Sequence, residues 1–153
     1  LNDVVISRGN VTRMIRLPTY IDGHWATTYH ADALVIATAT GSTAYALACG
    51  GPILPPELEN VLVVPVAPHL SLDRSIILPS DLSIRVQIDA DSGVDPVLAV
   101  DGARVCELHH DDEVMIQASS HLARFVRLRD RNYFYRSLLD RLEPRVHPPK
   151  ETP

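Results

Sequence analysis

Short apolar or alternating runs of residues, separated by turn-forming residues, make up most of the chain. The runs cover residues 4–6, 14–17, 33–37, 61–66, 75–78, 83–88, 96–100, 113–117 and 122–128. Runs of this length, bounded by glycine, proline or aspartate, are typical of β-strands. Asp22-Gly23, which lies between two alternating stretches, is a strong hairpin signal. Strands this short and closely spaced predict an all-β, sandwich-like fold.

Two segments depart from this pattern and predict helices. The first, residues 43–48, follows a turn rich in threonine, serine and glycine, and it ends at Gly50-Gly51-Pro52. Such a turn can gather backbone N–H groups and hydroxyls around a polar ligand, or it can simply cap the helix. The second, residues 132–142, carries a stripe of aromatic and leucine side chains. That stripe predicts an amphipathic helix that needs an apolar partner.

The composition excludes several classes of protein. The 153 residues fit one domain, and 46% hydrophobic and 22% charged residues are typical of a globular chain. The net charge of −5 argues against a nucleic-acid partner, and no apolar run is long enough for a membrane span. Cys49 and Cys106 are too few for a disulfide framework, which favours a reducing, cytoplasmic location.

Residues 32–51 carry an ordered set of motifs. Asp32-Ala33 opens the apolar run, Thr-Ala-Thr-Gly-Ser-Thr-Ala-Tyr occupies 38–45, and Gly-Gly-Pro follows at 50–52. This order resembles the core signature of the NAD kinases, which has glycine at the position of Ala33 and proline at that of Ala39. Asn2-Asp3 resembles the family's Asn-Glu segment. Its proline-histidine loop, last strands and tail are matched by residues 65–74, 100–102, 112–116 and 133–142.

The resemblance implies the NAD-binding domain of an NAD kinase. Such an enzyme transfers a phosphoryl group from ATP or polyphosphate, with Mg²⁺, to the adenosine 2′-hydroxyl of NAD, and it is a homo-oligomer, a dimer or a tetramer. The family's Gly-Gly-Asp-Gly loop, to which the resemblance assigns the catalytic base, does not occur in this sequence. We therefore expect the carboxy-terminal domain of a longer enzyme, with no catalytic residue of its own and no activity alone.

This expectation divides the chain into three segments. Residues 1–128 are predicted to form the NAD-binding β-sandwich. Residues 129–143 are predicted to form a helix that returns to an amino-terminal domain, and the proline-rich residues 144–153 a disordered tail.

The adenosine ribose of NAD presents two vicinal hydroxyls. Such a diol is held well by a carboxylate or carboxamide that accepts both O–H groups. Asn2 and Asp3 supply this pair, and the resemblance places them at the adenosine ribose. Taken alone, the pair is more simply a turn at the chain end. Aspartate in place of the family's glutamate shortens the second arm by one methylene.

The resemblance assigns the adenine to the threonine-rich turn and its surroundings. The residue that matches Asp32 accepts from the adenine amino group, often across a subunit boundary; the alternative is that Asp32 caps the turn at 38–42. The side chains of Thr40 and Thr43 and the backbone of Ala44 are expected at the adenine nitrogens. Tyr45 offers a ring face and a hydroxyl.

Further hypotheses concern other residues. Asp101-Gly102 fits the nicotinamide end of NAD and an ordinary hairpin turn equally well. No metal site is predicted, because His109-His110 beside Asp111-Asp112 offers only adjacent ligands on an exposed turn.

Two other functions stand as alternatives. One is a non-catalytic NAD-sensing module, and the other is a hydrolase that uses Ser42 or Ser71 with a histidine, although neither serine lies in G-x-S-x-G.

Overall fold

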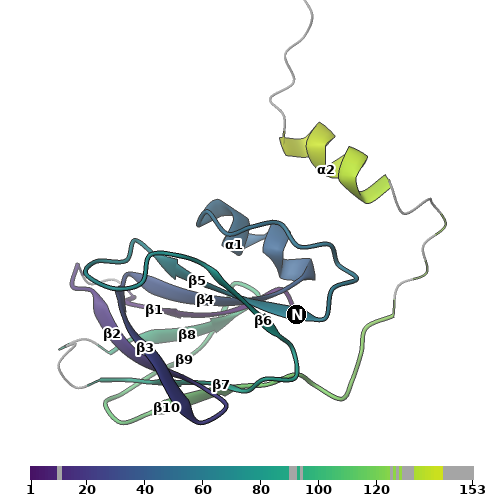
Figure 1. Ribbon diagram of the computed structural model, residues 1–153. Coiled ribbons are helices and arrows are strands. Elements are labelled where there is room, and N and C mark those ends of the chain that lie inside the picture. Colours follow the sequence, from purple (N-terminus) through teal and green to yellow (C-terminus); the bar gives the residue numbers. More distant parts are fainter. Residues whose placement is uncertain are drawn as a thin grey trace, which may run out of the picture. The chain divides into compact units, whose positions relative to one another are not determined.

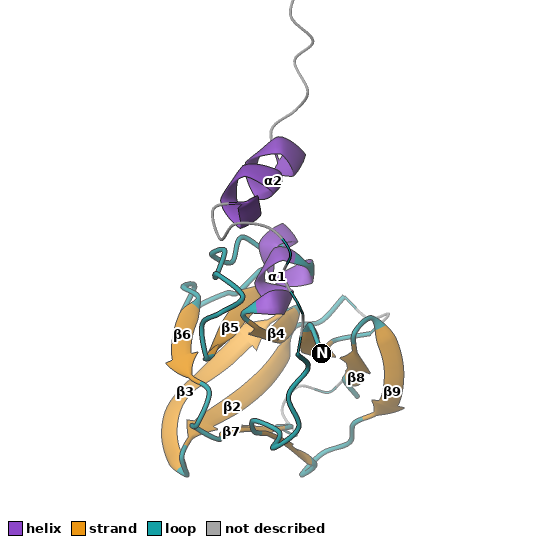
Figure 2. Ribbon diagram, turned by 90° about the vertical axis from the view of Figure 1, so that its right-hand side faces the viewer, coloured by secondary structure: helices purple, strands orange, loops and turns teal. Residues whose placement is uncertain are grey.

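The structure is a computed structural model that describes residues 1–9, 12–89, 93, 95–124, 126, 128 and 133–142. The chain divides into two units, Leu1–Ser119 and Ser120–Pro153, and each is described by itself. In the first unit the strands form two antiparallel sheets, which confirms the predicted all-β sandwich (Figures 1 and 2).

The two sheets differ in size. The six-stranded sheet has the order β6 (Ile76–Pro79), β5 (Asn60–Val66), β4 (Ala33–Thr38), β1 (Asp3–Ser7), β8 (Val97–Val100) and β9 (Ala103–Glu107). The four-stranded sheet has the order β10 (Glu113–Ile116), β7 (Ile84–Gln87), β2 (Ile15–Ile21) and β3 (His24–Ala31). Asp22-Gly23 forms the predicted hairpin between β2 and β3, and both residues have positive φ, 47° and 77°.

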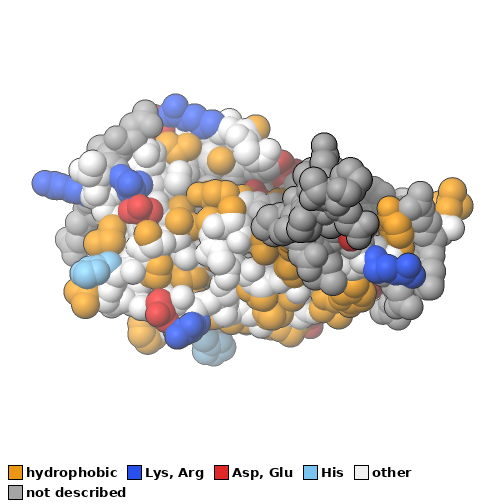
Figure 3. All heavy atoms as spheres, turned by 90° about the horizontal axis from the view of Figure 1, so that it is seen from above, with side chains coloured by type: hydrophobic (Ala, Val, Ile, Leu, Met, Phe, Trp, Pro, Cys, Tyr) orange, Lys and Arg blue, Asp and Glu red, His pale blue; other side chains and the backbone are white. Residues whose placement is uncertain are grey.

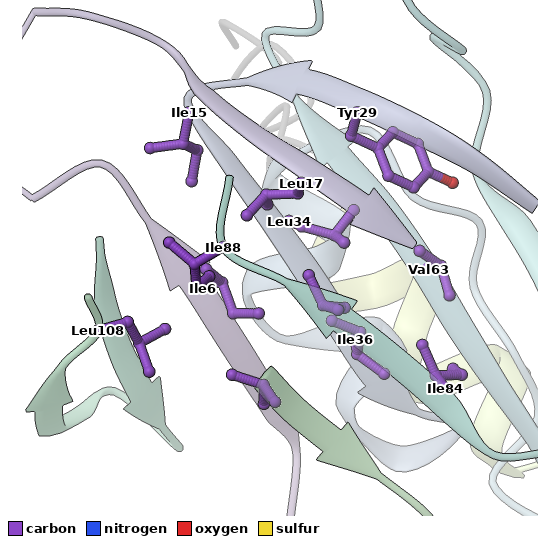
Figure 4. Close-up of a cluster of buried hydrophobic side chains, with 12 residues drawn as sticks. Ile6, Ile15, Leu17, Tyr29, Leu34, Ile36, Val63, Ile84, Ile88 and Leu108 are labelled. Atoms are coloured by element: carbon purple, nitrogen blue, oxygen red, sulfur yellow. The ribbon is translucent and has the colours of Figure 1, made fainter. Parts of the chain in front are cut away.

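Side chains from the facing sides of the two sheets fill the core (Figure 4). They alternate along each strand, as expected for a sandwich. The larger sheet contributes Ile6, Leu34, Ile36 and Val63, and the smaller one contributes Ile15, Leu17, Tyr29, Ile84, Val86 and Val114.

Strand β4 is buried on both of its faces, as its continuous apolar run predicts. Leu34 and Ile36 face the core between the sheets, whereas the small residues Ala33, Val35 and Ala37 belong to a second apolar cluster. The second cluster includes Ala46 of the one-turn helix α1 (Tyr45–Ala48), which lies over β4 and β5 in Figure 1. This third layer carries the threonine-rich turn.

Three sequence predictions need correction. The predicted helix at 43–48 is instead a 3₁₀ turn, η1 (Thr40–Thr43), followed by α1, with a break at Ala44. The predicted strand at 122–128 is wrong for its described residues, which lie outside any strand, and Leu122, Val126 and Leu128 are at least 75% exposed. Strand β9 was missed because all five of its residues are exposed, so no apolar alternation marks it. Backbone pairing with β8 forms this strand instead.

The second unit contains α2 (Tyr133–Leu142), the helix predicted at 132–142. Residue 132 and the predicted tail at 144–153 lie outside the described residues. Among the residues that the structure describes, no helix is long and apolar enough to cross a membrane.

Candidate functional site

Three strand ends meet at one end of the six-stranded sheet. Strand β1 lies between β4 and β8 and runs antiparallel to both, with Asp3 opposite Ala37 and Val4 opposite Val100. This register brings the beginning of β1 next to the turn that follows β4 and the turn that follows β8. Figure 2 shows the amino terminus near this end of the sheet. Asn2, Asp3, the turn at 38–45 and Asp101 are therefore gathered in one region.

Thr38 and Gly41 fasten the threonine-rich turn to the first strand. The Thr38 backbone N–H donates to the Asn2 carbonyl oxygen (2.9 Å), and the Thr38 hydroxyl donates to the Leu1 carbonyl (3.0 Å) and accepts from the Gly41 N–H (3.1 Å). A Cβ on Gly41 would lie 1.9 Å from the Asn2 carbonyl oxygen. Only glycine therefore permits this approach of the turn to Asn2.

Ser42 has a structural role within the turn. Its side chain is fully buried, donates to the Ala39 carbonyl (2.7 Å) and accepts from the Leu54 N–H (2.9 Å). The other candidate nucleophile, Ser71, bonds to the backbone of His30 rather than to its ring. Both arrangements argue against the hydrolase hypothesis. The bonds of Ser42 also explain why the predicted helix is broken, since they fix the path of η1 before α1 begins.

Asp101 connects the β8–β9 hairpin to the amino-terminal strand. Asp101 and Gly102 have positive φ, 49° and 79°, so the hairpin-turn hypothesis is confirmed. The Asp101 Oδ1 atom accepts the backbone N–H groups of Asn2 (2.5 Å) and Asp3 (3.2 Å). The bond from Asn2, followed by that from Asp3, lowers the pKa of Asp101 below its ordinary 3.8, although partial desolvation opposes this effect.

Asp3 is an acidic residue of this region whose carboxylate is partly desolvated. The residue is only 4% exposed, and among the described residues no hydrogen bond to its carboxylate is formed. Burial, and after it the negative charge of Asp101, raises the pKa of Asp3 above its ordinary value of 3.8. Among the described residues the Asp3 oxygens are not buried atoms that lack a partner, so solvent reaches them, and a ligand hydroxyl could take the place of that water. The neighbouring Asn2 is exposed.

The predicted adenine residues lie along η1 and α1. Thr40 and Thr43 are exposed, and the Thr43 hydroxyl donates to the Thr40 carbonyl (3.3 Å). The Ala44 N–H donates to the Gly41 carbonyl (2.9 Å), and the Ala44 carbonyl accepts from the Leu47 N–H (3.2 Å), so both backbone groups of Ala44 are already engaged. Tyr45 is 46% exposed, and partial burial raises its pKa above the ordinary 10.0.

Asp32 lies at the other end of β4 from the turn, although its negative charge contributes to the raised pKa of Tyr45. It precedes β4, whereas the turn follows β4, so about 20 Å of extended chain lies between them. The alternative that Asp32 caps the turn at 38–42 is therefore wrong, since Thr38 holds that turn. The Asp32 carboxylate instead pairs with Arg8, with 2.9 Å between Oδ1 and Nε, and the Asp32 N–H donates to the Val66 carbonyl (2.9 Å).

Sequence reasoning missed the contacts of Arg8 and Thr38. The register of β1 against β4 pairs Ser7 with Ala33, so the next residues outward, Arg8 and Asp32, lie opposite each other. The opposite charges of these two residues would have been the signal, but only once the register was known.

Metal binding finds no support in the described part of the chain. No group of three or more His, Cys, Asp or Glu residues there is arranged to hold a metal ion. His109 pairs with Asp95 (3.5 Å) and His110 with Asp111 (3.1 Å), and all four side chains are largely exposed.

Figure 3 shows part of the face that carries α1, seen from above. On the part that is visible, hydrophobic and uncharged polar atoms occupy the middle, and charged side chains lie toward the margin. Such a surface suits a planar base and a ribose better than a phosphate group.

Comparisons with known proteins agree on one family. The family model described as the ATP-NAD kinase C-terminal domain matches residues 1–128. An NAD kinase of Chloroflexus aggregans is 45% identical over 142 residues, which are 93% of this chain and 51% of that protein. An NAD kinase of Moorella thermoacetica is 38% identical over 143 residues, which are 94% of this chain and 45% of that protein. The chain thus spans about half the length of these relatives.

Two solved structures share the fold. A yeast NADH kinase in complex with NADH has a TM-score of 0.69 and 38% identity, over 74% of this chain and 33% of the yeast one. An NAD kinase from Archaeoglobus fulgidus in complex with ATP has a TM-score of 0.78 over 94% of this chain and 55% of the archaeal one. At 24% identity, the latter supports the fold alone.

Proposed function

Because the chain belongs to the ATP-NAD kinase C-terminal domain family, we propose that it is the NAD-binding part of an NAD kinase. The complete enzyme would transfer a phosphoryl group from ATP or polyphosphate to the adenosine 2′-hydroxyl of NAD and so produce NADP. The observation that carries the assignment of the site is Asp3, a residue only 4% exposed, whose carboxylate accepts no hydrogen bond from the described residues and lies beside the fastened turn. We take residues 1–128, the extent of the family match, as the NAD-binding domain.

Each residue has a distinct part in this proposal. The Asp3 carboxylate and the exposed Asn2 carboxamide accept the ribose hydroxyls, which gives Asp3 the donors it lacks. Thr40, Thr43 and the backbone of Ala44 face the adenine edge. Tyr45 presents its ring to the base.

We propose two roles for Asp101. Its Oδ1 atom holds the first strand through two backbone bonds, and its Oδ2 atom is proposed to reach the nicotinamide end of NAD.

The contribution of this chain to phosphoryl transfer is the positioning of NAD. Holding the 2′-hydroxyl in a fixed orientation removes several kcal/mol of the entropic cost of the reaction. The described residues form no metal cluster, so we propose that Mg²⁺ enters with the phosphates of ATP, and we assign it no ligand here. We also propose a cytoplasmic location, for which the two free cysteines are the support.

Asp3→Asn tests the proposed function. At neutral pH the variant should bind NAD about tenfold more weakly, because a charge-assisted acceptor for the ribose becomes a neutral one. The same variant should be more stable by about 1 kcal/mol, since a partly desolvated negative charge close to Asp101 is removed. Calorimetric NAD titration and urea unfolding measure the two effects. Asp81→Asn, on an exposed turn, is the matched control and should change neither.

The pH dependence of Asp3 follows from its raised pKa. The stability that this group contributes is fully present below pH 3.8 and is lost as the pH rises through its raised folded-state pKa. The stability gain of Asp3→Asn should therefore disappear in acid. NAD binding to the wild type should weaken as the pH falls through the same raised pKa, and binding to the variant should not. Equal NAD affinity of the two proteins at neutral pH would contradict the assignment.

We propose at least a dimer, as the family resemblance implies, in which Asp32 of one copy reaches the adenine held by the other. Within its own chain Asp32 lies at the end of β4 opposite to the turn, and its charge acts on Tyr45. The exposed edges of the two sheets offer backbone groups for such association.

Asp32→Asn is expected to weaken NAD binding about tenfold with little change in stability. The ion pair with Arg8 is about one-third exposed, and such pairs contribute less than about 1 kcal/mol. Light scattering and NAD titration of the same samples provide the measurement. A strictly monomeric chain at micromolar concentration would contradict the shared site.

A further inference from the structure

The residue before β4 is held by both neighbouring strands. The Arg8 backbone N–H donates to the Asp32 carbonyl oxygen (3.0 Å), and the Asp32 N–H donates to the Val66 carbonyl oxygen (2.9 Å). These bonds extend the pairing of β4 with β1 on one side and with β5 on the other. The backbone of Asp32 is therefore fixed from two directions.

An ion pair also holds the Asp32 side chain. The Asp32 Oδ1 atom lies 2.9 Å from the Arg8 Nε atom, and the two side chains are 34% and 29% exposed. Arg8 lies between the end of β1 at Ser7 and a turn at Gly9, whose φ is +62°. The guanidinium is thus supplied from the end of a paired strand, so the Arg8 backbone is as well placed as that of Asp32.

This arrangement restrains the carboxylate without using it up. An ion pair that is about one-third exposed contributes little to folding, but it limits the rotation of both side chains. An ionised carboxylate accepts at about four lone-pair positions on its two oxygens, and one ion pair engages only part of this capacity. The Asp32 carboxylate can therefore accept from a ligand while Arg8 sets its orientation.

We propose, on the basis of the proposed function of Asp32, that Arg8 is a positioning residue that orients the Asp32 carboxylate toward the adenine amino group. Arg8 does not touch the ligand and acts through Asp32. An amino group donates to a carboxylate, whereas a carbonyl oxygen at the same position of the base presents lone pairs that repel it. A carboxylate that cannot rotate away discriminates between the two bases, so Arg8 contributes to the selection of adenine.

Titrations with NAD and with the analogue that carries hypoxanthine in place of adenine test this proposal. The wild type should prefer NAD about tenfold, because the analogue has a carbonyl oxygen where adenine has its amino group. Arg8→Gln should weaken NAD binding about fivefold and leave binding of the analogue nearly unchanged, so most of the preference is lost. Arg8→Gln combined with Asp32→Asn should bind NAD no more weakly than Asp32→Asn alone, because both changes act on one contact.

Arg85→Gln is the matched control. Arg85 pairs with Glu113 on the other sheet, with 2.6 Å between Nη1 and Oε1, and 23% of its side chain is exposed. This variant should change neither the NAD affinity nor the preference. Equal losses for the two dinucleotides in Arg8→Gln, or additive losses in the double variant, would overturn the proposal. So would a wild type that binds NAD and its analogue equally well.

The orientation of the Asp32 side chain can also be measured without a ligand. Three-bond NMR couplings to the Asp32 Cγ atom report its χ1 angle. The wild type should show the couplings of a single rotamer, and Arg8→Gln should show values averaged over several. An unaveraged Asp32 side chain in Arg8→Gln would overturn the positioning role. If averaging occurs but the wild type does not bind NAD, the proposed function is wrong and the restraint of Asp32 by Arg8 stands.

Discussion

Gly41→Ala should lower the free energy of unfolding by about 3 kcal/mol and abolish NAD binding. The new Cβ would lie 1.9 Å from the Asn2 carbonyl oxygen, so either the turn or the first strand must move. Both carry residues of the proposed site. The backbone of Gly41 is not in the left-handed region, and the loss therefore comes from the contact rather than from conformation. Urea unfolding and NAD titration measure the two effects.

Gly23→Ala is the control for this substitution. Gly23 has no neighbour within 4 Å of an added Cβ, and its φ of +77° imposes only conformational strain of about 1 kcal/mol. NAD binding should survive in this variant. If Gly41→Ala were no more destabilising than Gly23→Ala and still bound NAD, the close packing of the turn on Asn2 would be wrong.

The chain alone should bind NAD weakly and form no NADP from ATP and Mg²⁺. Its sequence lacks the Gly-Gly-Asp-Gly loop, to which the family resemblance assigns the base. Loss of a general base costs about 10²–10⁴-fold in rate, and loss of the phosphate contacts adds to this. We expect a rate at least about 10⁴-fold below that of a complete NAD kinase, measured by coupling NADP to an NADP-specific dehydrogenase.

Appreciable NADP formation by the pure chain would contradict this division of the active site. Binding without turnover also agrees with a non-catalytic NAD-sensing module. The coding sequence upstream of this chain distinguishes a kinase domain from a sensing module. A Gly-Gly-Asp-Gly segment encoded there would rule out the sensing module.

The fold could be predicted wherever burial leaves a pattern in the sequence. Strand β4 was predicted because both of its faces are buried, and the β2–β3 hairpin because Asp22-Gly23 readily adopts positive φ. Strand β9 and the stretch at 122–128 show the limit of this reasoning. The first is an exposed strand that backbone pairing alone holds, and the second contains apolar residues that remain exposed.

The candidate site could be predicted by residue type but not by contact. The motif led to Asn2, Asp3 and the turn, but which hydroxyl faces inward depends on tertiary packing. The Ser42 hydroxyl accepts a hydrogen bond from the Leu54 N–H inside the turn, whereas Thr40 and Thr43 stay exposed. The bonds of Asp101 to the first strand could not be predicted either, because Asn2 and Asp3 lie 99 and 98 residues before Asp101 in the sequence.

The most direct test of the account is an NAD titration of the ¹⁵N-labelled chain followed by amide NMR. We predict saturable shifts at Asn2, Asp3, residues 40–45 and Asp101, and a smaller response with Asp3→Asn. Strands β7 and β10 on the other sheet, where Arg85 pairs with Glu113, should remain unchanged. Absence of saturable shifts, or shifts centred on β7 and β10, would contradict an NAD site at the meeting of the three strand ends.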